Sequence, residues 1–239
     1  MSSAVSQQHD SALHQACSEG KQSTVLRMLN DPAYECNSLN DIGWTPLQCA
    51  ISQKQWSVVL ILLKHPKVDI EVENDDGNTL IHLLAKDSPP DDQSDNSVTG
   101  ALLETAVKRG ASLYRRNNMG EYPLHFACLA GNVCAAEHLI RLGCYPSIRT
   151  FGGETPLHYA ILSGQSKMVK VLLESGSDPF SSNSCGLTPV DIALDRSLAK
   201  SSSGDQVLSM LNVSHHQLLN LPYHGAGDRG SWLGGAGCK

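Results

Sequence analysis

The chain has 239 residues, of which 41% are hydrophobic and only 5% aromatic, so its core must be built from aliphatic side chains. The formal net charge of −6 argues against a nucleic-acid-binding protein, which normally carries a basic domain or stripe. The first residues are polar, unlike a signal peptide, and the longest apolar run, Val58 to Leu63, is too short to cross a membrane. We therefore expect an intracellular protein without membrane insertion, in the cytoplasm or, alternatively, the nucleus.

A short phrase typical of a helix start recurs along the chain. In Thr155-Pro156-Leu157-His158, the threonine hydroxyl can cap the helix, and proline at the first helical position loses no hydrogen bond. The copies follow one another at intervals of 34, 34, 43, 33 and 33 residues, and a period near 33 predicts an array of supersecondary units. Aligned on the apolar residue of the phrase, they are centred on Leu13, Leu47, Ile81, Leu124, Leu157 and Val190.

A second apolar phrase follows most copies of the first, as in residues 25–29, 58–63, 135–140 and 169–173. Its apolar residues have the three- and four-residue spacing of a helix. Two of these helices should end at Gly143 and Gly176, which can adopt the left-handed conformation of a C-cap. Polar, turn-rich stretches then lead to the next copy. The predicted unit is helix, turn, helix and hairpin loop.

In phrase and period the sequence resembles the ankyrin-repeat family, whose signature is Thr-Pro-Leu-His-x-Ala. The resemblance implies an all-α solenoid of stacked helix-turn-helix units with projecting hairpin loops over residues 10–213. Ser11-Ala12 and Asp191 depart from the signature, as expected of capping units that have one face in water. We expect a polar segment at 1–9, a flexible Gly-rich tail at 214–239, and units at about 10–40, 41–74, 75–117, 118–150, 151–183 and 184–213.

The 43-residue interval locates an insertion at residues 87–97, between the two helices of the third unit. Its Pro, Asp and Ser content cannot form a core, so we interpret it as a tolerated surface loop. The alternative is a regulatory site, with Ser88 before Pro89 as a proline-directed phosphorylation position.

Several histidines and cysteines recur at positions of the repeat, which favours a structural role. His82, His125 and His158 occupy the same position of successive units, so they should bond neighbouring loops rather than converge on one point. Cysteines at small-residue positions should be reduced packing residues, and two others should be exposed. The packing residues are Cys17, Cys128 and Cys144, and the exposed ones are Cys185 and Cys238. An alternative zinc site at His215, His216, His224 and Cys238 matches no standard spacing.

The sequence contains no nucleophile elbow, no phosphate-binding glycine loop and no paired acids. We therefore predict no catalytic residue, no cofactor and no metal. The predicted function is a non-catalytic protein-interaction module (adaptor, inhibitor or scaffold), monomeric, that binds another protein and no nucleic acid. The alternative is the regulatory or targeting portion of a larger enzyme or signalling protein whose catalytic domain is absent from this chain.

The resemblance implies binding through a concave face formed by the hairpin tips and the exposed edges of the first helices. Large apolar residues stand at several tips, where they would mark an interaction site, although Trp44 and Phe151 could instead pack on neighbouring tips. Acidic residues beside them predict a partner surface of basic and apolar groups. Leu129, Leu162 and Gln53 add helix-edge positions. The predicted tip residues are Asp41, Ile42, Trp44, Asp75, Asp76, Asn78, Met119, Glu121, Phe151, Glu154 and Leu187.

Asn37 occupies the position of the loop asparagine in the ankyrin pattern. The resemblance implies two roles for it. It can be a target of asparaginyl hydroxylation, or it can simply close the loop by hydrogen bonding.

Overall fold

The computed structural model describes residues 11–87, 89, 98–198 and 207–211. Within these ranges the chain forms eleven helices and a further helical turn at 207–210, and it has no β-strand. The helices are α1 (Ala12–Ser18), α2 (Gln22–Asn30), α3 (Pro46–Ser52), α4 (Trp56–Lys64), α5 (Leu80–Asp87), α6 (Val98–Lys108), α7 (Pro123–Ala130), α8 (Val133–Arg141), α9 (Pro156–Leu162), α10 (Ser166–Glu174) and α11 (Pro189–Leu198).

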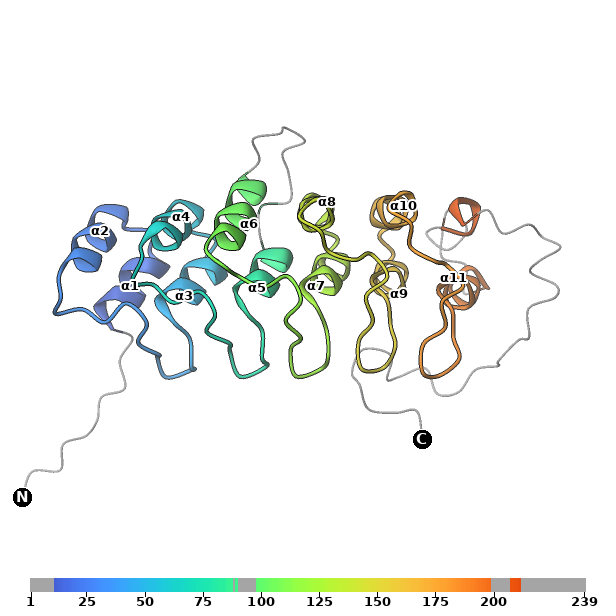
Figure 1. Cartoon of the computed structure of the whole chain (residues 1–239), viewed down its shortest axis with the longest axis horizontal. Coiled ribbons are helices and arrows are strands. Elements are labelled where there is room, and N and C mark those ends of the chain that lie inside the picture. The colour runs from blue at the N-terminus through green and yellow to red at the C-terminus, as the bar shows by residue number, and fades with distance from the viewer. Residues whose placement is uncertain (1–10, 88, 90–97, 199–206, 212–239) are drawn as a thin grey trace, which may run out of the picture.

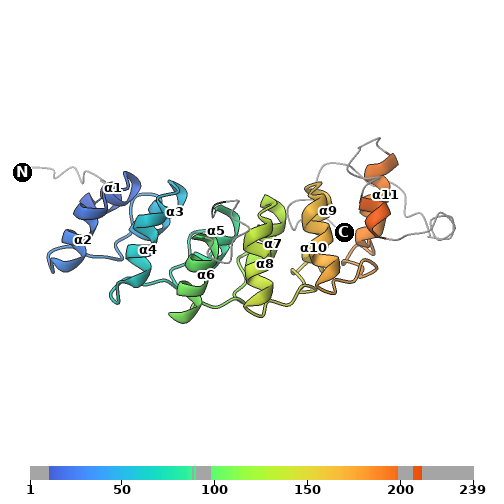
Figure 2. The ribbon, with the colours of Figure 1, turned by 90° about the horizontal axis from the view of Figure 1, so that it is seen from above.

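The helices lie in two rows that run the length of an elongated array. Odd-numbered helices form one row and even-numbered helices the other, and a loop leaves each even-numbered helix to make a turn beyond the odd-numbered row (Figure 1). Viewed from above, successive pairs follow one another along the long axis (Figure 2). The fold is an all-α solenoid, as predicted.

The recurring phrase starts a helix because its first and fourth residues cap each other. The Thr45 N–H donates to Gln48 Oε1 at 2.8 Å, and the Gln48 N–H donates to Thr45 Oγ1 at 3.3 Å. In a later copy the Thr155 N–H donates to His158 Nδ1 at 3.0 Å. Histidine or glutamine thus performs the task that glutamate usually has in a capping box.

The core lies between the two rows and is aliphatic. From the even-numbered helices it receives Val59, Leu103 and Leu172, which are fully buried. Aliphatic contacts of this kind stabilise an array mainly through neighbouring units, because each unit packs only on the next. The aligned apolar residue of every copy is buried as well: Leu13, Leu47, Ile81, Leu124, Leu157 and Val190.

The turns and the long interval agree with the sequence. Gly143 and Gly176 follow α8 and α10 with φ values of +107° and +88°, so they adopt the predicted left-handed conformation. Because α5 ends at Asp87 and α6 begins at Val98, the predicted insertion falls between these two helices. Ser88, most of the insertion and the predicted tail, including its alternative zinc ligands, lie outside the described residues.

The cysteines agree with the sequence in part. Cys17, Cys128 and Cys144 are buried free thiols in the core, as predicted. Burial raises the pKa of the Cys17 and Cys144 thiols to about 12, which suppresses the reactive thiolate. Cys185 is exposed, as predicted, but it is disulfide-bonded and not the expected free thiol.

Candidate protein-binding surface

Each loop turns around one side chain, seven residues before the aligned apolar residue. Asn117 Oδ1 accepts the N–H groups of Met119 at 3.0 Å and Glu121 at 2.8 Å, and the Asn117 N–H donates to the Glu121 carbonyl at 3.0 Å. These bonds fix the turn without a strand. We call the five turns the tips: residues 40–44, 74–78, 117–121, 150–154 and 183–187. Their closing residues are Asn40, Asn74, Asn117, Thr150 and Asn183.

The recurring histidines attach each helix to the following tip. His82 Nε2 donates to the Glu121 carbonyl at 3.2 Å, and His125 Nε2 donates to the Glu154 carbonyl at 3.1 Å. Burial lowers the pKa of both imidazoles to about 4, so they are neutral at physiological pH. His158 bonds the Leu187 carbonyl in the same way. These contacts support the predicted structural role of the histidines.

Successive tips touch one another and form a continuous ledge, which we call the tip ledge. The Asn118 N–H donates to the Asp76 carbonyl at 2.9 Å, and its side-chain amide donates to the Asp75 carbonyl at 2.9 Å. Phe151 lies over the next tip back, where a Cβ on Gly120 would stand 2.4 Å from Phe151 Cγ. These contacts between tips order the surface in the absence of a partner.

Three of the five predicted apolar tip residues are exposed on this ledge. Ile42 is 58% exposed, Met119 44% and Phe151 64%. Trp44 and Leu187 are half-buried, and their carbonyls accept hydrogen bonds from the histidine of the preceding unit. Phe151 packs on a neighbouring tip and still keeps most of its ring in water. The two interpretations of this residue are therefore compatible.

The predicted polar tip residues fall into two groups. Asp41, Asp75 and Asp76 are exposed. In contrast, three side chains bond within the array: Asn78 accepts from the Asn117 amide at 3.0 Å, Glu121 accepts from the Tyr159 hydroxyl at 2.6 Å, and Glu154 accepts from the Thr150 hydroxyl. Asn78 is only 6% exposed. We therefore leave Asn78, Glu121 and Glu154 out of the proposed surface and treat them as parts of the scaffold.

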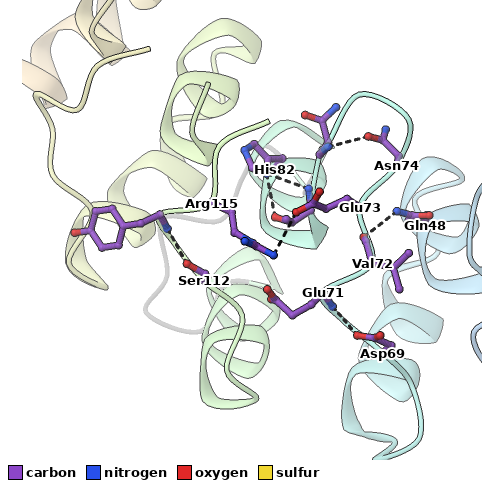
Figure 3. Close-up of polar contacts among 12 residues, drawn as sticks. Gln48, Asp69, Glu71, Val72, Glu73, Asn74, His82, Ser112 and Arg115 are labelled. Carbon is purple, nitrogen blue, oxygen red and sulfur yellow. Dashed lines mark hydrogen bonds and ion pairs between the residues drawn. The ribbon is translucent and has the colours of Figure 1, made fainter. Parts of the chain in front are cut away.

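Arginines flank the exposed aromatic end of the ledge. The Arg116 guanidinium lies 5.2 Å from the centroid of the Tyr122 ring and 5.4 Å from that of Phe151. Such stacking orients the arginine, whose Nε also donates to the Tyr122 hydroxyl. Arg115, the preceding residue, reaches back one unit and pairs with Glu73 at 3.5 Å, as the dashed line in Figure 3 shows. One acidic group near the ledge is thereby neutralised.

The helices beside the ledge add a second strip of apolar surface. Leu129 at the end of α7 is 39% exposed, as predicted, whereas Leu162 at the end of α9 is half-buried and packs against the core. Gln53, beside α3, is exposed. Sequence reasoning missed Phe126 and Tyr159, which follow the repeat histidine and stay half-buried. The available signal was an aromatic residue at the variable position of two adjacent copies.

Asn37 bridges two units with both ends of its amide. Its Nδ2 donates to the Lys67 carbonyl at 2.8 Å, and its Oδ1 accepts the Asp69 N–H at 2.7 Å. This geometry supports the loop-closing role, because both ends of the amide bond the loop of the following unit.

Comparison with known proteins assigns the architecture to a family. The sequence profile of ankyrin repeats (3 copies) matches residues 3–74 and 76–183, which is most of the chain. The chain belongs to the ankyrin-repeat family. Two solved ankyrin-repeat structures share its fold: an ankyrin repeat domain from Acinetobacter baumannii (TM-score 0.66, 20% identity, 83% of this chain and 96% of that one) and the ankyrin repeat protein EF0377 (TM-score 0.70, 21% identity, 84% and 96%).

The chain also resembles curated proteins over part of their length. The chain is 24% identical over 165 residues to the human transient receptor potential cation channel subfamily A member 1, which covers 55% of this chain and 14% of the channel. It is 28% identical over 134 residues to human neurogenic locus notch homolog protein 1, covering 56% of this chain and 5% of that protein. It is 31% identical over 84 residues to ankyrin repeat-containing protein C6C3.08 of Schizosaccharomyces pombe, covering 34% and 36%. The chain therefore spans a minor part of each relative.

The described part of this ankyrin array also bears on two other features, a membrane-spanning helix and a metal site. None of its helices combines the length and hydropathy needed to cross a bilayer. Among the same residues, no group of three or more His, Cys, Asp or Glu side chains is arranged to hold a metal ion.

Proposed function

We propose that this chain is a non-catalytic, monomeric protein-interaction module that binds its partner through the tip ledge and the adjoining surface of α7 and α9, the concave face of the array. The observation that carries the proposal is the exposure of Ile42, Met119 and Phe151 on tips whose backbones are held by internal hydrogen bonds. An adaptor, inhibitor or scaffold would use such a surface. Because ankyrin repeats are a protein-interaction fold, membership of the family supports the general proposal of protein binding.

Rigidity makes these side chains effective anchors. A surface that is already ordered loses little conformational entropy on binding, so more of its contact energy appears as affinity. The Asn117 and histidine bonds order the backbone, and the Arg116 stack restrains the Phe151 ring. Aromatic residues and arginine are also the types most often found at the energetic centre of an interface. We therefore place that centre at Met119, Arg116 and Phe151.

A second candidate function is the regulatory or targeting portion of a longer protein. The length of the relatives favours it, because matching regions make up 14% of the channel and 5% of the notch protein. Blotting of the endogenous protein with an antibody to this array tests it. A species much larger than 25.7 kDa supports this candidate, and a species of that mass alone contradicts it.

The interaction surface is tested by partner capture with matched variants. Met119→Ala with Phe151→Ala should remove the captured proteins while helical circular dichroism stays unchanged, because both side chains project into solvent. Tyr145→Ala is the control, since Tyr145 is an aromatic residue with 71% exposure outside the tips. Loss with the double variant and retention with the control supports the ledge. Equal retention with both variants refutes it.

A further inference from the structure

Charge and apolar surface are segregated along the tip ledge. Asp41, Asp75 and Asp76 project from the first two tips, and the next two tips carry Met119 and Phe151. Ile42 adds an apolar group at the acidic end. The guanidinium of Arg116 stands beside Phe151. The ledge thus changes from acidic to apolar and cationic along the array.

The carboxylates at the acidic end are available to a partner. Within the described ranges, no ion pair involves Asp41, Asp75 or Asp76. Other acids near the ledge are already used: Glu73 pairs with Arg115, and Glu121 accepts the Tyr159 hydroxyl. Negative charge open to a ligand is therefore concentrated on the first two tips.

We propose that the occupant of the tip ledge is an extended peptide segment with two linked features, a proposal that rests on the function proposed above. Lysine or arginine side chains of the segment lie on Asp75 and Asp76, where their charges are complementary. A large apolar side chain of the same segment packs on Phe151, beside Met119. The acidic end directs the segment, and the apolar end supplies most of the affinity.

The repeat geometry sets the distance between the two features. Helices of neighbouring units pack about 10 Å apart, so two units separate the groups by about 20 Å. Tip 74–78 and tip 150–154 are two units apart in the array (Figure 1). An extended chain rises about 3.3 Å per residue, which gives a spacing of about six residues. A helical segment, at about 1.5 Å per residue, would need about 13.

Selection from a displayed library of random peptides of about 16 residues, on the immobilised chain, tests this without knowledge of the natural partner. Selected peptides should share a basic pair and an apolar residue about six positions apart. Individual peptides are then measured by fluorescence anisotropy. Asp75→Asn with Asp76→Asn should weaken binding about 3- to 10-fold, and high salt should remove that difference. Phe151→Ala should weaken it at least about tenfold. Glu137→Gln, which removes the charge of an exposed acid on α8 away from the ledge, is the control and should change nothing.

The outcomes separate this inference from the function on which it rests. The inference is overturned if the selected peptides carry no basic residues and bind the variant Asp75→Asn with Asp76→Asn as well as the wild type. If those peptides still lose binding with Phe151→Ala, the ledge remains the binding surface. A spacing of about 13 residues overturns the extended occupant. If no peptide is sensitive to Met119→Ala with Phe151→Ala, the proposed surface and the inference both fail.

Discussion

Replacing His125 by glutamine should make the array less sensitive to acid while preserving its fold. His125 is fully buried and neutral, with its pKa lowered to about 4 by burial, whereas an unfolded histidine titrates near 6.5. The unfolded state therefore binds the proton first as the pH falls. Stability from the neutral imidazole is complete above about pH 6.5 and is lost progressively as the pH falls towards 4.

The magnitude follows from the two pKa values. Between pH 7 and pH 5, one such histidine should lower the free energy of unfolding by about 2 kcal/mol, and the pair His82 and His125 should lower it by about 4 kcal/mol. The array contains its own control for the substitution. At the equivalent position Gln48 accepts the Thr45 N–H at 2.8 Å, and it donates to the Val72 carbonyl at 3.3 Å, just before the tip 74–78, as Figure 3 shows for the second bond. Glutamine can therefore keep the capping bond and still bond a carbonyl of the following loop, without the titrating group.

Urea denaturation followed by circular dichroism at pH 7, 6 and 5 provides the measurement. At pH 7, His125→Gln should lie within about 1 kcal/mol of the wild type, because the capping bond is kept and only the bond to the following loop changes its acceptor. Between pH 7 and pH 5 the wild type should lose about 2 kcal/mol more than the variant, and titration of the carboxylates cancels because both proteins share it. Equal losses in the two proteins would refute the assignment of acid sensitivity to this histidine.

Three further predictions concern packing. Gly100→Ala should destabilise the array by about 1–2 kcal/mol, because a Cβ there would stand 2.2 Å from His138 Nε2. In a His138→Ala background the same change should instead stabilise α6. If Gly100→Ala is destabilising in both backgrounds, the clash is contradicted. Arg109→Met should cost about 1–3 kcal/mol, seen as a lower melting temperature, because the guanidinium donates to the Val68 carbonyl at 2.9 Å and to the Leu63 carbonyl at 3.2 Å, beyond its own unit. Thiol labelling of the native protein should leave Cys128 unmodified until it unfolds, since burial raises its pKa; rapid labelling would contradict its place in the core.

Local sequence was enough to predict the repeat. A capping residue, a proline and a buried leucine act within one helical turn, so the residue types of Thr155, Pro156 and Leu157 have the same effect wherever they recur. The period then predicts the number of helices, and glycines in the left-handed conformation mark where helices end. Sequence could also have located the tip asparagines, which share that period, but their task is visible only when Asn117 is seen to close its own turn.

The tertiary structure decided which tip residues face solvent. Glu121 and Asp75 are both acidic tip residues, yet Glu121 is bound by Tyr159, 38 positions along the chain, and Asp75 is exposed. Contacts between units depend on how neighbouring units stack, and no pattern within one unit encodes them. The sequence by itself determined the scaffold, because the residues that specify it act within one unit. Only the stacked structure could separate the exposed Asp75, Met119 and Phe151 from residues that hold the array together, because exposure is a property of the assembled surface.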